Sequence, residues 1–350
     1  MMRSLLATLC ACAFCLLAAP AYPCGGGFGA GITIDSSQTI LVTHRAGVES
    51  YVFRPHFCGQ AAQFGLILPV PATLTANPVL ADPALFAELD RISAPTHVAR
   101  TECRGRIGPD AGAANYAHDG GVSGPEIIDY GQVGIFDWVL LKADSAASFT
   151  AWLDANGFPH DASAEPLFSH YVQKGWFFVA FKVTAGESAP PAGSLLCGDL
   201  GPIQVSFTAA VPVVPTRIAA ASTSAYSTLA WRIYAVAERQ LGASMSEYHA
   251  KLRFSGALDS AALASAPELA KLAVAGDRLT KFEVFFSPST EADLALASDV
   301  SNDFRETIDD VTYVDCAPPG GGCSSTGTGA MVLGASALAL APLLWRRRRR

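Results

Sequence analysis

Residues 133–142 read Val-Gly-Ile-Phe-Asp-Trp-Val-Leu-Leu-Lys, and residues 176–183 read Trp-Phe-Phe-Val-Ala-Phe-Lys-Val. Both runs are short, strongly apolar and rich in β-branched and aromatic residues, which is typical of buried strands. The 33 or so residues between them are long enough for helices that return the chain to the same sheet. The stretch therefore predicts a strand, helical segments and a second strand packed together.

Two helices are expected between these strands. Phe149, Trp152 and Leu153 recur at helical spacing, so we expect them to cover one face of a helix that Gly157 ends. Asp144 or Ser145 can cap its start, because both side chains accept from backbone N–H groups. A shorter helix is expected over 166–173.

Moving outward, a hairpin is expected from strands 39–43 and 48–54 around Ala46-Gly47, with further strands at 63–68, 203–208, 228–236 and 280–286. Ile203, Val205 and Phe207 alternate with polar residues, as in a half-buried antiparallel strand. Helices are expected after Asp82-Pro83, around 246–252 and over 267–275. The predicted fold is α+β, with mostly antiparallel twisted sheets, packed helices and disulfides.

Two segments resemble each other: residues 64–71 follow a loop with Cys58, and residues 203–215 follow a loop with Cys197. Both run into paired prolines, which end strands because proline cannot donate to a ladder. A duplicated half-sheet and convergent strand-end chemistry explain this equally well. A further break is expected near 103–132, where the chain is rich in Gly, Ala and Asp, so 22–315 is one domain or two sub-domains.

The N-terminus predicts export. Arg3 precedes an apolar stretch, and Ala19-Pro20-Ala21 is a small-x-small cleavage site, so residues 1–21 read as a signal peptide. Signal peptidase is the expected partner, and the mature chain is expected to begin at Tyr22.

The C-terminus predicts a membrane segment. A linker over 316–329 contains Cys323, residues 330–345 are apolar, and Arg346–Arg350 form a basic end that stays in the cytoplasm. Sixteen residues in a helix span about 24 Å, slightly less than a hydrocarbon core of about 30 Å. This order resembles the myxobacterial-type C-terminal sorting domain, and the resemblance implies that a sorting protease cuts at Cys323. The alternative is a permanent tail anchor in which Cys323 pairs with Cys316.

The charge excludes one class of partner. The net charge is −7, but six of the 24 basic residues lie in the terminal segments (Arg3 and Arg346–Arg350), leaving 18 against 31 acidic residues. The exported part is therefore −13, which argues against binding nucleic acid or anionic lipid.

Cysteines outside the signal peptide are expected to form disulfides, because export leads to an oxidising compartment. With Cys323 assigned to sorting, the candidates are Cys24, Cys58, Cys103, Cys197 and Cys316. The preferred pairs are Cys24–Cys103 and Cys58–Cys197, since Cys58 and Cys197 lie in the two matching loops.

No local motif predicts catalysis. The chain has no Gly-x-Ser-x-Gly elbow, no zinc helix, no phosphate-binding Walker loop and no EF-hand loop. Weak candidates for ligands have structural explanations that are favoured over binding: His44, His56 and Cys58 for metal, Asn302, Asp303, Asp309, Asp310 and Asp315 for calcium, and Trp152, Tyr171, Trp176, Phe177 and Phe178 for carbohydrate. We therefore assign no catalytic, cofactor or metal residue and expect no cofactor.

These residues together resemble a family of exported bacterial proteins, the domain of unknown function 2330. The resemblance spans roughly 24–315 and rests on the Cys-Gly-Gly start, the strand over 64–71, the block 133–183, Pro215-Thr-Arg-Ile-Ala and the strand over 279–282. Cys58, Cys197 and the glycine-rich stretch after Cys103 depart from the family pattern. The resemblance implies export and a mixed α/β fold, without a reaction.

The leading hypothesis is a non-enzymatic, surface-tethered domain that binds or scaffolds at the cell envelope. The rival is an envelope enzyme, hydrolase-like, whose catalytic residues lie far apart in sequence. A deep pocket with convergent polar groups would favour the enzyme and a flat face the scaffold.

Overall fold

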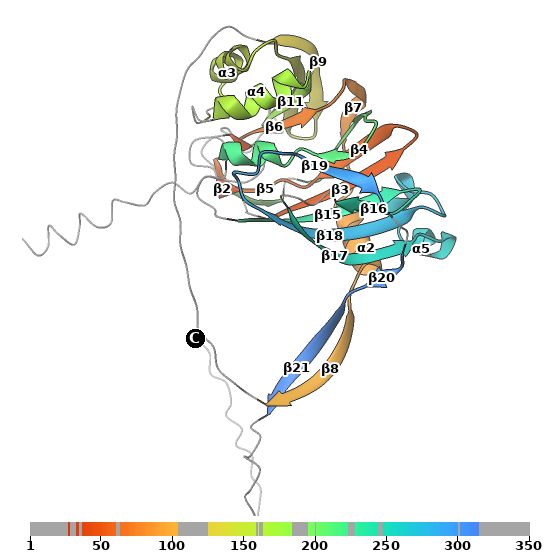
Figure 1. Cartoon of the computed structure of the whole chain (residues 1–350). Helices are drawn as coiled ribbons and strands as arrows, with labels where there is room; N and C mark the ends of the chain where they lie inside the picture. The colour runs from red at the N-terminus through yellow and green to blue at the C-terminus, as the bar shows by residue number, and fades with distance from the viewer. Residues whose placement is uncertain are drawn as a thin grey trace, which may run out of the picture. The chain divides into compact units, whose positions relative to one another are not determined.

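The protein is described here from a computed structural model, which describes residues 27–28, 33–34, 37–60, 64–103, 125–158, 160, 164–183, 195–199, 201–222, 228–243, 248–299 and 302–314. The chain divides into two compact units, one formed by 1–99 with 108–310 and the other by 100–107 with 311–350. All the described helices and both large sheets belong to the first unit (Figure 1).

The smaller of the two large sheets has five strands. Their order is β1 (Gly27–Phe28), β6 (Gly65–Val70), β11 (Phe177–Val183), β10 (Phe136–Lys142) and β9 (Glu126–Val133), and every pairing is antiparallel. The two strands at its centre, β10 and β11, are the apolar runs that the sequence marks most strongly.

The larger sheet has eight strands. Their order is β20 (Phe304–Arg305), β17 (His249–Ala257), β18 (Arg278–Phe286), β15 (Leu229–Ala237), β3 (Ser37–Arg45), β4 (Val48–Phe53), β13 (Ile203–Thr208) and β7 (Leu74–Leu80). Only the β15–β3 pair is parallel. At the β3–β4 turn Ala46 and Gly47 both adopt positive φ, 51° and 77°, which matches the twist of a tight hairpin.

Three small sheets complete the strands. They are β12 (Leu195–Asp199) with β5 (His56–Gln60) and β2 (Thr33–Ile34), β14 (Val213–Val214) with β19 (Leu294–Ser298) and β16 (Leu241–Ala243), and β21 (Thr307–Val314) with β8 (Thr96–Cys103). The register between β5 and β12 places Cys58 and Cys197 directly opposite each other.

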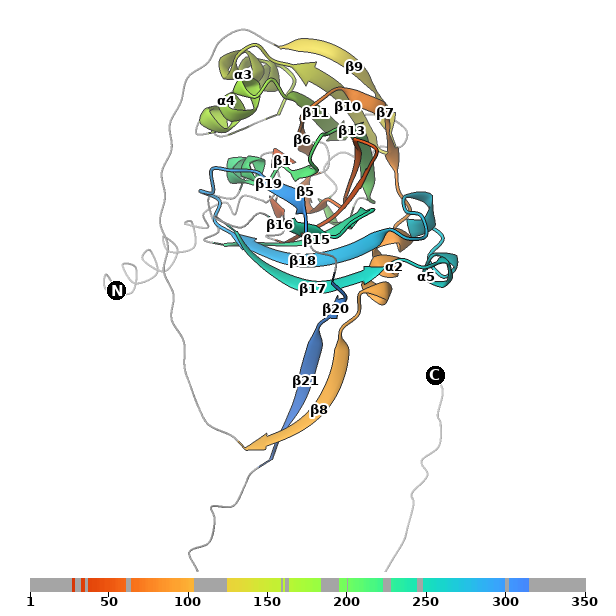
Figure 2. The same ribbon diagram turned by 45° about the vertical axis from the view of Figure 1, so that its right-hand side comes forward.

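Helices cover the outer faces of both large sheets. Helices α3 (Ala146–Ala155) and α4 (Glu165–Gln173) pack on the five-stranded sheet, and α2 (Ala84–Ile92), α5 (Ser260–Ala264) and the 3₁₀ turn η5 (Leu269–Lys271) pack on the eight-stranded sheet. Figures 1 and 2 show the two helix groups on opposite sides of the sheets. A third apolar core fills the space between the sheets. The first unit is thus a sandwich of two sheets between two helical layers.

Strand alternation explains the layers. In β10, Phe136, Trp138 and Leu140 belong to the core between the sheets, whereas Leu141 packs beneath the helices. In β11, Phe178 and Ala180 likewise face the helices. Because both faces are covered over most of their length, these strands are apolar except at Asp137, Lys142 and Lys182.

Most elements confirm the sequence predictions, including the antiparallel α+β class, the hairpin and the two helices between the apolar strands. Ser145, rather than Asp144, caps α3 in a reciprocal capping box with Ser148. Gly157 follows the helix with φ of +68°. The strand predicted from Val133 begins at Phe136, because Gly134, with φ of +57°, turns the chain out of β9.

Two predicted helices are wrong. The region expected to be helical around 246–252 enters strand β17, where Arg253 forms ion pairs with Glu283 of β18 and with Glu306. The stretch 267–275 contains only η5, because the chain comes back to the end of β17 just before β18 begins. There Gly276 N donates to Leu258 O, and Leu258 N donates to Asp277 O. Pairing across the sheet therefore outweighs local helix propensity.

Several predictions fall on residues outside the description. These are the signal peptide, the stretch 104–124, the linker and Cys323, the apolar segment 330–345 and the terminal arginines. Within the described ranges, no helix is both long and apolar enough to cross a membrane.

Candidate functional site

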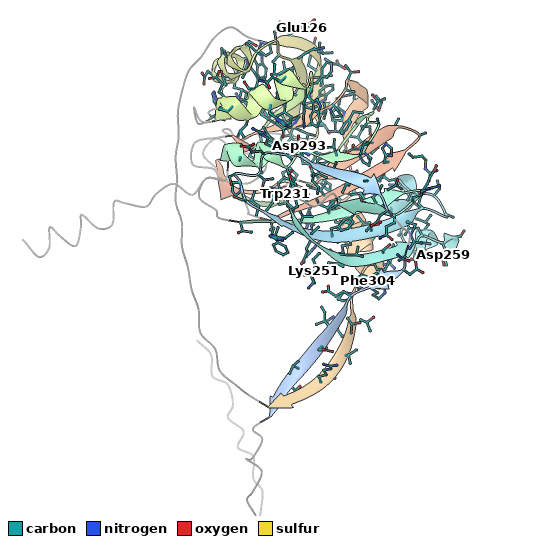
Figure 3. All side chains as sticks on the ribbon, in the orientation of Figure 1. Glu126, Trp231, Lys251, Asp259, Asp293 and Phe304 are labelled. Carbon is teal, nitrogen blue, oxygen red and sulfur yellow. The ribbon has the colours of Figure 1, made fainter. Side chains whose placement is uncertain are left out.

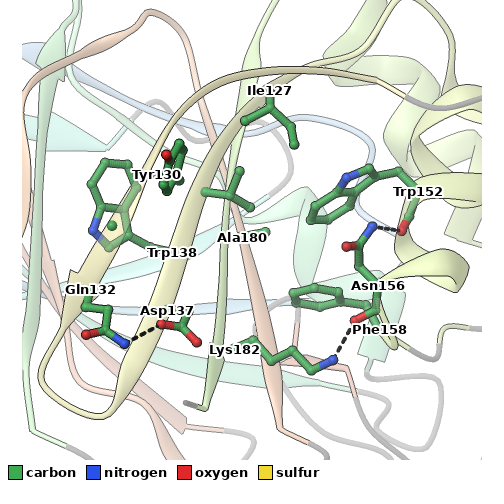
Figure 4. A pocket seen from close by; sticks show the side chains of 12 residues that line it. Ile127, Tyr130, Gln132, Asp137, Trp138, Trp152, Asn156, Phe158, Ala180 and Lys182 are labelled. Atoms are coloured by element: carbon green, nitrogen blue, oxygen red, sulfur yellow. Dashed lines mark hydrogen bonds between the residues drawn. The ribbon is translucent and has the colours of Figure 1, made fainter. Parts of the chain in front are cut away.

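A groove lies on the outer face of the five-stranded sheet, beside the C-terminal end of α3. Its volume is about 600 Å³, within the range of roughly 300–1,000 Å³ typical of ligand sites. Figure 4 shows the side chains around it, and the lining residues are Ile127, Tyr130, Gly131, Gln132, Asp137, Trp138, Val139, Trp152, Asn156, Phe158, Ala180 and Lys182.

The floor consists of two rows of side chains that run across the strands. Strand register places Asp137 between Gln132 and Lys182, and Val139 between Tyr130 and Ala180. Because residues two apart in a strand share a face, both rows point to the same side of the sheet. Ala180 is small and buried, so the floor is low where a larger side chain would fill it.

The wall consists of the last turn of α3 and the residue that follows it. Trp152 lies in the last turn of this helix, Asn156 is the C-cap residue, and Phe158 comes after the left-handed Gly157. Phe158 lies directly over the backbone of Gly65 in β6, where an added Cβ would collide with its ring. The close approach of Phe158 to the sheet thus requires glycine at position 65.

Aromatic contacts hold Trp152 in place. Its ring is nearly parallel to that of Phe149, at 6.5 Å and 7°, and it also stacks on Phe158 at 5.6 Å. Phe149 in turn stacks on Phe178 of β11 at 4.0 Å. Of the three residues predicted to cover one face of this helix, Phe149 and Leu153 are buried and Trp152 packs against them, half-buried at the groove.

The polar side chains of the groove are already oriented by protein contacts. Gln132 Nε2 donates to Asp137 Oδ1 at 2.7 Å, and Asn156 Nδ2 donates to Trp152 O at 2.8 Å. Lys182 Nζ donates to Asn156 O and lies 5.5 Å from the centre of the Phe158 ring. These bonds appear as dashed lines in Figure 4. A ligand would meet polar groups that are set before it arrives.

One side of the groove is the edge strand β9. Tyr130 is 77% exposed and Ile127 is 53% exposed. The register shift opposite Leu140 and Leu141 leaves Ile128 as a bulge, and Tyr130 N donates to Asp129 Oδ1 at 2.8 Å. Bulges and occupied N–H groups discourage the addition of another strand, so a ligand here would be held mainly by side chains.

A second polar cluster surrounds Asp293, which is labelled in Figure 3 and whose side chain is 2% exposed. Oδ1 accepts from the Tyr171 hydroxyl at 2.7 Å and from Arg217 N at 3.2 Å, while Oδ2 accepts from Lys174 Nζ at 3.2 Å. His170 Nε2 lies 3.4 Å from Oδ2. These contacts join α4 to η4 (Arg217–Ser222) and to the start of β19.

The histidine in this cluster is fixed rather than poised for catalysis. Burial, with the Lys174 and Arg217 cations, lowers the pKa of His170 below its usual value. The neutral ring then accepts from Arg217 Nη1 at Nδ1, 3.1 Å away, and donates from Nε2 to Asp293. Since four donors occupy the carboxylate, the arrangement is that of a structural clamp.

Glu49 of β4 is a fully buried carboxyl. Oε2 accepts from Val213 N at 3.0 Å, and Oε1 has no partner among the described residues. Burial raises the pKa of Glu49 well above its usual value, and the bond from Val213 only partly opposes this effect. A proton is therefore retained in the folded protein at pH values where the unfolded chain has lost it.

We expect the Glu49→Gln variant to differ from the wild type in its pH dependence. Above about pH 4.3 the unfolded chain binds fewer protons at this residue than the folded protein does, so wild-type stability falls as the pH rises toward the raised pKa. Glutamine does not titrate, so the stability of the variant does not fall for this reason. Urea unfolding from pH 4 to pH 7 should show its free energy of unfolding rising relative to wild type, by up to about 1.4 kcal/mol per pH unit. Glu238→Gln, at a side chain 70% exposed, controls for loss of one charge; equal slopes in all three proteins would contradict the prediction.

The structure does not gather the weak metal candidates. His44 Nε2 contacts Ala209 O, Asp303 pairs with Arg278, and Asp310 contacts His97. Asp315 lies outside the described residues, as do the side chains of His56 and Cys58. Among the residues that are described, no three His, Cys, Asp or Glu side chains come together as metal ligands.

The five aromatic residues named as carbohydrate candidates do not form one surface. Tyr171 and Phe178 are buried beneath α3 and α4, Trp176 and Phe177 are half-buried, and only Trp152 of the five lines the groove. Sequence reasoning missed Gln132, Asp137 and Lys182. A signal for the last two was present, since each is a charged residue inside an otherwise apolar strand, but only strand register shows that they are neighbours.

The fold and groove define an α+β sandwich with an open, aromatic-lined cavity on one sheet. The chain matches, over residues 19–304, the family model described as an uncharacterized protein conserved in bacteria (DUF2330). The protein belongs to this family.

Other comparisons add little. No curated protein matches the chain. Among solved structures it is similar to the crystal structure of baculovirus P35, with 8% identity over 76% of this chain and 97% of that chain, and a TM-score of 0.34. That likeness is too slight to inform either the fold or the function.

Proposed function

We propose that this protein is a non-enzymatic binding domain of the cell envelope, which holds its ligand in the groove beside Trp152. The supporting observation is the preset geometry of that groove: an indole held by stacked aromatic rings above a floor of oriented polar side chains. Rigid aromatic side chains are effective binding groups because little conformational freedom is lost when a ligand covers them.

The arrangement supports binding more than catalysis. Asp137 and Lys182 are the groove's ionisable pair, and each is engaged by a neighbouring group that orients it. Within the described part of the chain, the groove lining contains no Ser, Thr, Cys or His beside a base, as covalent catalysis would require.

The binding proposal is tested by co-sedimentation of the full-length protein, in mild detergent, with washed insoluble envelope material from cells that lack it. Wild-type protein should sediment with this material, and Trp152→Ala should bind at least tenfold more weakly. Trp176→Ala is the matched control, because it removes the same half-buried side chain from a position outside the groove lining. Equal binding by wild type and Trp152→Ala would overturn the proposal.

Export and tethering form the second part of the proposal. Cleavage after Ala21 would release the signal peptide, and processing at Cys323 would remove 330–345 and the terminal arginines. Intact mass of envelope-extracted protein tests this, with Cys323→Ala as the comparison. If both forms retain Arg346–Arg350, the tail is an ordinary membrane anchor.

A disulfide between Cys58 and Cys197 is expected in the exported protein. The two residues are paired across antiparallel strands, where Cα atoms are about 4.5–5.5 Å apart, a separation that a disulfide spans. Its loss in Cys58→Ser should lower the free energy of unfolding by about 2–4 kcal/mol. Peptide mapping without reductant identifies the bond, and two free thiols at these positions would contradict it. The other proposed pair, Cys24–Cys103, involves side chains outside the described residues.

A further inference from the structure

We infer that the groove binds a neutral polysaccharide, with one sugar ring stacked on Trp152. This inference rests on the proposed binding function and specifies its ligand. A pyranose ring has one face of polarised C–H groups and a rim of hydroxyls, so it needs a flat aromatic surface beside planar polar groups. The negative face of an aromatic ring attracts the positive edge that such C–H groups present.

The aromatic part is in place. Trp152 is held by Phe149 and Phe158 and is left half-exposed at the groove, while Tyr130 is largely exposed on the edge strand. In Figure 4 the Trp152 ring and Tyr130 stand on opposite sides of the hollow above Ala180. The two rings can therefore serve successive sugar units of one chain.

The hydrogen-bonding part favours hydroxyl groups. The amide nitrogens of Gln132 and Asn156 donate within the protein, which directs their carbonyl oxygens to a ligand. Asp137 accepts only, and its Oδ2 has no partner among the described residues. Lys182 adds ammonium protons. A hydroxyl can donate to the acceptors and accept from Lys182, which a purely cationic or purely anionic ligand cannot do.

Charge and strand geometry exclude the main rivals. Asp137 and Lys182 are opposite in register, so the groove carries one charge of each sign and favours neither a bare cation nor an anion. The exported part is acidic, which disfavours an acidic polymer. An extended peptide would add to β9, but the bulge at Ile128 and the occupied Tyr130 N–H interfere with strand addition.

Calorimetric titration of the full-length protein in mild detergent tests the ligand class directly. The probes are soluble neutral oligosaccharides of glucose and of N-acetylglucosamine, with an oligogalacturonide as an anionic sugar and oligolysine as a cation. We expect binding to at least one neutral oligosaccharide, at least a tenfold loss in Trp152→Ala, and wild-type affinity in Trp176→Ala. Thermal unfolding of each variant verifies that it is folded. Tighter binding of the anionic sugar or of oligolysine would overturn the inference.

The envelope assay separates failure of this inference from failure of the binding function. A mixture of glycosidases degrades polysaccharide, whereas a protease removes protein. If envelope binding depends on Trp152, survives the glycosidases and disappears after protease treatment, the ligand is a protein: the polysaccharide inference is wrong and the binding proposal stands. If binding disappears after glycosidase treatment and survives protease, both are supported.

Discussion

Replacing Asp293 by alanine is expected to lower the free energy of unfolding by about 3–5 kcal/mol, because two buried donors, the Tyr171 hydroxyl and Arg217 N, then lose their acceptor. The carboxylate is 2% exposed and accepts from the Tyr171 hydroxyl, Arg217 N and Lys174 Nζ. Lys174 also loses the anion that its ammonium contacts. Urea unfolding at pH 7 measures the loss.

A matched change at the edge of the same cluster should have little effect. The Lys174 side chain is 40% exposed, so in Lys174→Ala water can take the place of the ammonium beside Asp293. We therefore expect the free energy of unfolding to fall by less than about 1 kcal/mol. Asp293→Asn keeps the shape of the side chain and one acceptor oxygen, so its loss of stability should lie between those of Asp293→Ala and Lys174→Ala. A loss under 1 kcal/mol in Asp293→Ala would show that the cluster does not clamp α4 to η4 and β19.

The Phe149→Ala variant is expected to lose about 3–5 kcal/mol of stability and also to weaken ligand binding in the groove. Phe149 is fully buried and contacts the rings of Phe178, Phe168 and Trp152. Truncation leaves a cavity beneath Trp152, and an indole without support can turn away from the groove. Unfolding and oligosaccharide titration measure the two effects on one protein.

Phe149→Leu separates packing from ring stacking. Leucine keeps much of the volume, so its stability loss should be about 1 kcal/mol, while Trp152 loses its parallel ring. Weakened binding in Phe149→Leu despite nearly normal stability would show that stacking positions the indole. Full binding in Phe149→Ala would contradict the view that Phe149 supports the site.

Both predictions concern the region between α3, α4 and the five-stranded sheet. Phe149 supports the groove wall from within. Asp293 ties α4 to η4 and to the start of β19, and α4 in turn packs against α3. The groove is thus built on elements fixed by a buried aromatic core and a buried ionic cluster, as a preorganised binding site requires.

Local signals in the sequence were sufficient for the elements with strong periodicity. The apolar runs that became β10 and β11, the cap at Ser145, the stop at Gly157 and the turn at Ala46-Gly47 depend on interactions within a few residues, so they can be read from the order of residues alone. Together with the alternation in 203–208, they determined the antiparallel α+β class, whereas the family was indicated by the resemblance of blocks such as 133–183.

Only the tertiary structure decided the rest. Local composition predicts helices around 246–252 and over 267–275, but strand pairing with β18 and the return bonds at Leu258 outweigh a propensity worth well under 1 kcal/mol per residue. The site is also non-local: Gln132, Asp137 and Lys182 become one row through strand register, and Trp152 comes to stand above it because α3 ends there. Composition and spacing therefore determined most of the strands and helices and the acidic charge of the chain, whereas pairing and packing between distant segments decided the remaining elements and which side chains share a groove.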